Sequence, residues 1–97
     1  MEIKIPKSFQ LTGHTYKVKL VKKVDKEDSC GEVLYEKKLI KLRKPTKDYT
    51  IQMVEETLLH EIIHAILYEC EYKELSENEE LIERLSRAVK QVIKTLE

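Results

Sequence analysis

The hydrophobic pattern of this chain changes its period near residue 50, and that change restricts the fold more than any other feature of the sequence. Residues 16–21 alternate apolar and charged side chains, which places Tyr16, Val18 and Leu20 on one face of a strand. Residues 51–67 instead carry apolar side chains at intervals of three and four, as a largely buried helix does. Strands followed by helices predict an α+β fold.

The strand region is expected to occupy residues 1–47 and to form a small antiparallel sheet of about three strands. Residues 9–11 are a weaker extended stretch before the first clear strand. Residues 24–29 are polar and predict a loop. Pro45 is expected to end the sheet, because its nitrogen has no hydrogen to donate to a neighbouring strand.

The last strands are predicted to form a β-hairpin. Residues 32–35 and 39–43 are rich in apolar and β-branched side chains and flank a short polar stretch, as hairpin strands do. Four residues are expected to pair across this hairpin, namely Val33 and Tyr35 with Ile40 and Leu42.

The helical region is expected to occupy residues 48–97. Its first helix begins near Thr50 and meets no glycine or proline before Lys73. The second helix runs from Glu77 nearly to the end, with Ser76 as N-cap and Glu79 completing a capping box. We therefore expect one domain, residues 1–97, in which two packed helices cover one face of the sheet.

Charge is distributed unevenly along a chain whose net charge is zero. Residues 1–47 hold 13 Lys and Arg against 6 Asp and Glu, whereas residues 48–97 hold 5 against 12. Basic strands and acidic helices that solvate opposite sides of one domain explain this pattern. A nucleic-acid surface on the basic strands is the alternative, but one Phe and no Trp leave little to stack on bases.

The composition also predicts a compartment. No apolar run approaches the roughly 18 residues that a membrane span needs, and residues 1–6 lack the apolar core of a signal peptide. Cys30 and Cys70 lie far apart and match no metal-binding spacing. We expect a cytoplasmic monomer without a membrane partner.

The predicted first helix carries the motif His60-Glu-Ile-Ile-His64. A separation of four residues places both imidazoles on one side of a helix, one turn apart, where they can chelate a metal ion. Neutral imidazoles suit Zn²⁺, and Glu61 can reach a water molecule beside the ion. The pattern predicts His60 and His64 as zinc ligands and Glu61 as general base.

A catalytic zinc site commonly has three protein ligands, and the second helix offers carboxylates for the third. If that helix packs antiparallel to the first, its first turn lies near the two histidines. Glu79 borders the expected inward face and is the preferred ligand. Glu83 and Glu80 remain alternatives, although Glu80 is expected to point outward and Glu83 to pair with Arg87.

This arrangement resembles the gluzincin-type zinc metallopeptidases, in which His-Glu-x-x-His is followed by a helix carrying a glutamate. Asn78-Glu79 stands 14 residues after His64, and the match is nearest to the compact, often phage-associated ImmA/IrrE-like family and to the single-domain minigluzincins. The resemblance implies a minimal zincin-like domain with Zn²⁺ on His60, His64 and Glu79. It also implies that an edge strand of the hairpin aligns a peptide substrate.

The expected function is therefore hydrolysis of a peptide bond in a peptide or a flexible protein segment. Larger gluzincins use a downstream His or Tyr to stabilise the oxyanion, and this chain has no His after His64. Tyr68 and Tyr72 are the candidates for that role or for a substrate contact. A zinc-binding interaction module without catalysis remains an alternative, as does a nucleic-acid-binding domain that uses the basic strands.

Overall fold

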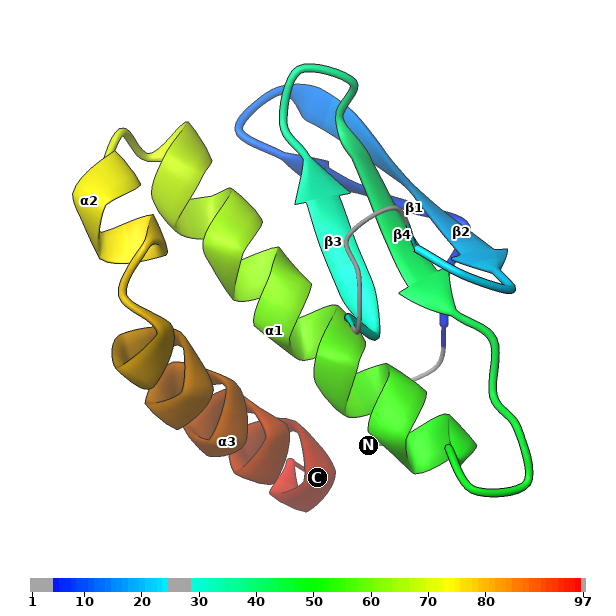
Figure 1. Ribbon diagram of the computed structural model, residues 1–97. Helices are drawn as coiled ribbons and strands as arrows, with labels where there is room; N and C mark the ends of the chain where they lie inside the picture. Colours follow the sequence, from blue (N-terminus) through cyan, green and yellow to red (C-terminus); the bar gives the residue numbers. More distant parts are fainter. Residues whose placement is uncertain (1–4, 25–28, 97) are drawn as a thin grey trace.

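The α+β fold is confirmed. The computed structural model describes residues 5–24 and 29–96. These residues form four strands and then three helices, β1 (Ser8–Leu11), β2 (His14–Val21), β3 (Gly31–Leu34), β4 (Leu39–Arg43), α1 (Ile51–Glu69), α2 (Lys73–Ser76) and α3 (Glu79–Thr95) (Figure 1).

The sheet differs from the expected one in strand number and direction. It has four described strands in the order β1-β2-β4-β3, and β2 and β4 run parallel while the other two pairs are antiparallel. Alternation of apolar and polar residues sets which face of a strand is buried, but it leaves the partner and its direction open. β3 follows β2 in sequence, but β4 lies between them in the sheet. β3 is therefore the edge strand opposite β1.

The hairpin prediction was correct for Val33, which lies opposite Ile40, and wrong for Tyr35. Pairing ends at Leu34 and Leu39, so Tyr35 lies in the turn, and the partner of Leu42 is Gly31. The turn takes four residues instead of the expected three, which frees Tyr35 from the ladder. Residues 25–28 of the predicted loop lie outside the described residues.

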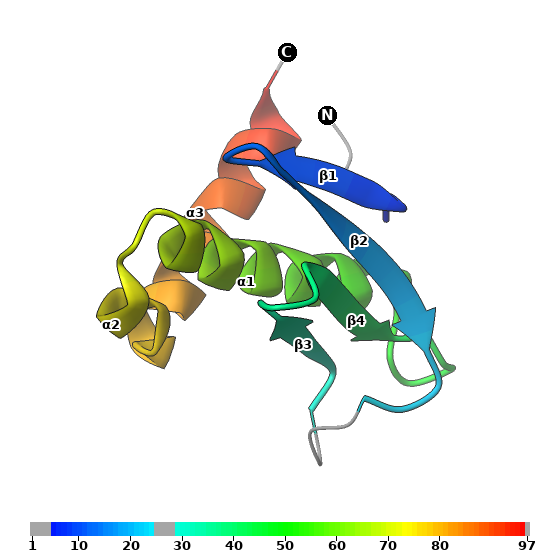
Figure 2. The ribbon, with the colours of Figure 1, turned by 90° about the horizontal axis from the view of Figure 1, so that it is seen from above.

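The core lies between the sheet and α1. Tyr16, Val18 and Ile40 point from the inner face of the sheet and pack with Val54 and Leu58 of α1. Figure 2 shows α1 running beside β3 and β4, the two strands that it contacts most. Leu20, predicted on the same face as Tyr16, lies towards the strand end and is more than a third exposed.

Helix α1 begins and ends close to the predicted positions. Thr50 is its N-cap, and the Thr50 hydroxyl accepts a hydrogen bond from the Met53 backbone N–H. At the other end, the buried carboxylate of Glu69 accepts a hydrogen bond from the Tyr16 hydroxyl at 2.5 Å and one from Lys38 Nζ at 2.6 Å. Glu69 thereby ties the end of α1 to β2 and to the tip of the hairpin.

Helix α3 runs antiparallel to α1, as expected, but its start was misassigned. Residues later in α3 contact residues earlier in α1. The contacting pairs are His64 with Glu79, His60 with Glu83 and Glu56 with Lys90. Helix α1 lies between the sheet and α3 (Figure 1). Only α1 therefore has the extensive contact with the sheet that was expected of both helices.

The predicted capping box at Ser76 is wrong. Asn78 is the N-cap of α3, and its side chain accepts a hydrogen bond from the Leu81 backbone N–H at 3.1 Å. Ser76 belongs instead to the short helix α2 and is buried. Ser76 and Asn78 are both residue types that favour N-caps, and they lie two positions apart. Ser76 is buried and makes other contacts, so Asn78 caps the helix.

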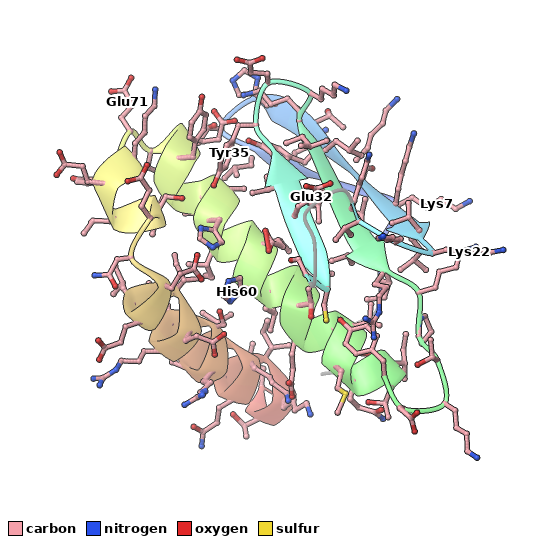
Figure 3. All side chains as sticks on the ribbon, viewed as in Figure 1. Lys7, Lys22, Glu32, Tyr35, His60 and Glu71 are labelled. Carbon is pink, nitrogen blue, oxygen red and sulfur yellow. The ribbon has the colours of Figure 1, made fainter. Side chains whose placement is uncertain are left out.

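Both signs of charge occur on the sheet and on the helices, as Glu32 of β3 and Arg84 of α3 show. Lys7 and Lys22 project from the sheet, whereas Glu71 projects beside α2 at the opposite end (Figure 3). Among the described residues, no helix combines the length and apolar character that crossing a membrane requires.

Candidate metal centre

Helix α1 presents His60 and His64 to α3. Their ring centroids are 4.9 Å apart, and the two Nε2 atoms are separated by 3.3 Å. Figure 3 shows His60 in the space between α1 and α3. The spacing of one helical turn therefore brings one nitrogen of each ring to a common point.

The first turn of α3 brings Glu79 to the same point. Its Oε2 lies 3.1 Å from His60 Nε2 and its Oε1 lies 3.2 Å from His64 Nε2. Two ligands on one tetrahedral zinc ion, each about 2.0–2.1 Å from it, lie roughly 3.3 Å apart. The three residues predicted as ligands are thus grouped closely enough for one atom of each to reach a shared ion, all three atoms lying within 4.8 Å of one another.

The other nitrogen of each ring is held by a hydrogen-bond partner. His60 Nδ1 lies 3.2 Å from Glu83 Oε1, and a carboxylate accepts hydrogen bonds without donating any. His64 Nδ1 lies 3.3 Å from Ser76 Oγ, whose hydrogen is donated to the His64 carbonyl oxygen at 3.1 Å. Both contacts are those of a neutral ring that carries its hydrogen on Nδ1.

This tautomer leaves both Nε2 atoms with a lone pair directed towards the Glu79 carboxylate. A cation at the centre would then accept an electron pair from each of the three side chains, whereas without an ion a hydrogen on His64 Nε2 can be donated to Glu79. Burial lowers the pKa of His64, which favours the neutral imidazole that metal ions bind. Two imidazoles and a carboxylate match the His₂Glu set of catalytic zinc.

The two alternative third ligands have other partners. Glu80 is exposed and pairs with Arg84 one turn along α3, at 2.8 Å. Glu83 does approach Arg87 as predicted, at 3.7 Å, but its closer contact is with His60. Glu83 therefore contacts a predicted ligand, which charge spacing alone did not indicate.

Glu61, the predicted general base, follows His60 on α1 and is buried, with 8% of its surface exposed. It lines the same groove as His60 and Glu83. Burial, together with the negative charges of Glu61 and Glu79, raises the pKa of Tyr35. Glu61 therefore belongs to the surroundings of the predicted ligands.

The two tyrosines predicted for the oxyanion differ in position. Tyr68 stacks on Tyr35, with ring centroids 4.0 Å apart, and lines a small cavity with His64 and Glu79. Tyr72 is 59% exposed and lines neither of the two hollows described here. The structure therefore keeps Tyr68 near the ligands and moves Tyr72 away from them.

The ligand cluster lies between two hollows. The larger is a groove of about 820 Å³ between α1, α3 and the start of β3, with Leu59 and Met53 on α1 and Lys94 on α3. The smaller is a cavity of about 380 Å³ on the side of His64 and Tyr35. An extended chain of several residues could cross the ligands from one hollow to the other.

Sequence reasoning missed Ser76 and Tyr35. It assigned Ser76 to an N-cap and Tyr35 to a strand, yet the Tyr35 hydroxyl lies 3.1 Å from Ser76 Oγ beside the ligand His64. Neither residue has a signal in the sequence beyond a hydroxyl group, so only the fold could identify them.

No known family, curated protein or solved structure matches this chain.

Proposed function

We propose that this protein is a zinc-dependent metallopeptidase of the gluzincin type. His60, His64 and Glu79 would hold Zn²⁺, and Glu61 would act as general base. This proposal rests on the convergence of His60, His64 and Glu79, which each offer one ligand atom within 4.8 Å of the other two. The neighbouring buried carboxylate of Glu61 and the groove beside it add the means to act on a bound chain.

A zinc ion in this site would polarise a carbonyl group and make a nearby water molecule more acidic. Glu61 would accept a proton from that water on its carboxylate and then donate it to the leaving nitrogen. Glu61 is buried and lines the groove in which the substrate would lie. Glu83 would hold the His60 ring in the tautomer that leaves Nε2 free to bind.

The substrate class that we propose is a peptide or a flexible segment of another protein. β3 is an edge strand of the sheet and starts at the groove, where Gly31 is part of the lining. An extended peptide can add to such an edge through backbone hydrogen bonds. Addition there would carry the scissile bond across α1 towards Glu61.

We also propose that the protein works as a monomer in a reducing compartment, the cytoplasm. Cys30 and Cys70 are both free, and Cys70 is exposed. Exposed thiols persist where glutathione and thioredoxin keep them reduced.

The test compares wild type with Glu61→Gln on a library of internally quenched peptides, after loading with one equivalent of Zn²⁺. Loss of a general base slows hydrolysis by about 10²–10⁴-fold, and zinc content should stay unchanged because Glu61 is not a ligand. Glu80→Gln, the same change at an exposed position on α3, should retain activity. Equal rates for wild type and Glu61→Gln would refute the assigned role.

A zinc-binding interaction module without catalysis is the second candidate. It is favoured by the openness of the site, since 64% of the Glu79 side chain is exposed. This alternative predicts stoichiometric zinc in the purified protein and no cleavage of any peptide in the library. Zinc-dependent cleavage that is lost in Glu61→Gln would exclude it.

A further inference from the structure

Ser76 is a buried residue whose hydroxyl meets three groups from different parts of the chain. Its Oγ lies 3.1 Å from the His64 carbonyl oxygen, 3.3 Å from His64 Nδ1 and 3.1 Å from the Tyr35 hydroxyl. A serine buried to this extent needs partners, and here all of them belong to the surroundings of one metal ligand.

The single hydrogen of the Ser76 hydroxyl determines the direction of all three bonds. A carbonyl oxygen can only accept, so this hydrogen goes to the backbone of His64. Ser76 Oγ is then left with two lone pairs. They accept one hydrogen from His64 Nδ1 and one from the Tyr35 hydroxyl.

Tyr35 is held in place by contacts between the hairpin tip and the last turn of α1. Its ring stacks on Tyr68, and the hairpin tip that carries it is tied to the end of α1 by the ion pair of Lys38 with Glu69. The position of the Tyr35 hydroxyl is therefore set by contacts that do not involve the metal ligands. The hydroxyl can fix Ser76 before any ion binds.

We propose that Ser76 and Tyr35 are positioning residues of the metal centre. Together they hold His64 with its hydrogen on Nδ1, so that the Nε2 lone pair faces Glu79 and His60. The inference rests on the proposed function only in taking zinc as the ion. It predicts a prearranged imidazole in the metal-free protein and tighter zinc binding as its consequence.

The decisive variant is Ser76→Ala, compared with Ser76→Thr and Ser86→Ala. Ser86 is also buried, and its hydroxyl donates to the Ile82 carbonyl without touching a ligand, so it is a matched control. Loss of an outer-shell partner weakens metal binding by about 10–100-fold. We expect that loss in Ser76→Ala, near wild-type affinity in Ser86→Ala, and recovery in Ser76→Thr, which keeps the hydroxyl.

Tyr35→Phe isolates the second contact. It removes one hydrogen bond to Ser76 but leaves Oγ able to accept from His64 Nδ1, so we expect weaker zinc binding by a smaller factor than in Ser76→Ala. Tyr68→Phe, in the ring that stacks on Tyr35, is its control and should bind zinc as wild type does.

Two measurements separate this inference from the proposed function. Zinc affinity is measured by competition with a chromophoric chelator. The tautomer of His64 in the metal-free protein is read from ¹⁵N NMR of the imidazole. We expect the Nδ1–H form in wild type and a loss of that preference in Ser76→Ala.

If the wild-type protein takes up no zinc, the proposal of a zinc metallopeptidase is refuted. The ¹⁵N spectra would still test whether Ser76 keeps the hydrogen of His64 on Nδ1. Wild-type zinc affinity and an unchanged tautomer in Ser76→Ala would overturn the inference. If Ser76→Ala does not fold, Tyr35→Phe decides the matter, and an affinity and tautomer equal to those of wild type would overturn it.

Discussion

Replacing Ile82 with alanine should loosen the helix that carries Glu79. Ile82 is fully buried and is the one apolar residue of α3 in the described core. Truncation of a buried isoleucine to alanine removes three carbons and costs about 2–4 kcal/mol in the free energy of unfolding. For a domain of this size the melting temperature should fall by at least about 10 °C.

Zinc should offset most of that loss, because its proposed ligands come from both α1 and α3. An ion that binds only the folded protein, at a free concentration 100 times its Kd, adds about 2.7 kcal/mol. Urea denaturation followed by far-UV circular dichroism, with zinc and with a chelator, measures both effects. Val92→Ala, at a position of α3 that is 55% exposed, is the control and should change stability far less.

Two results would refute this reasoning. A loss below about 0.5 kcal/mol in Ile82→Ala is typical of a surface position, and would mean that Ile82 does not anchor α3. Equal stability with zinc and with chelator, in wild type and variant alike, would mean that no ion links the two helices.

Three further outcomes follow from the same contacts. The hydrogen bond from Lys38, with that from Tyr16, holds the pKa of Glu69 below its usual range. The folding stability from Glu69 is therefore complete above about pH 4.5 and is lost as the pH falls further, so Glu69→Gln should flatten the acid limb of a stability–pH curve. An alanine Cβ at Gly31 would lie 2.6 Å from a methyl carbon of Thr57 on α1, so Gly31→Ala should cost about 1–3 kcal/mol in a urea titration. Glu83→Gln, which weakens the bond to His60 Nδ1, should lower zinc affinity by roughly 10-fold in a chelator competition, and affinity equal to wild type would remove Glu83 from the site.

The parts of the fold that depend on local pattern could be predicted from the sequence. The spacing of three and four residues identified α1 and its start near Thr50, and the fixed turn of a helix brought His60 and His64 together. Glu79 was found because antiparallel packing of two helices places the start of one beside the later turns of the other. Each step needed only periodicity and the geometry of a helix.

The remaining features depend on contacts between distant parts of the chain. The tip of the hairpin docks on α1 through Glu69, which bonds Lys38 and Tyr16, 31 and 53 residues away in sequence. That docking moves Tyr35 out of the ladder and places it beside Ser76. The alternating pattern likewise does not determine that β2 pairs with β4 in parallel, because other strands share the same pattern.

The central claim is that two imidazoles of α1 and one carboxylate of α3 bind the same zinc ion. X-ray absorption at the zinc edge of the loaded protein tests it most directly. We predict two imidazole nitrogens and a carboxylate oxygen at about 2.0–2.2 Å, with the imidazole signal reduced in His64→Ala. A spectrum dominated by sulfur from the free cysteines, or by water oxygens alone, would contradict the account.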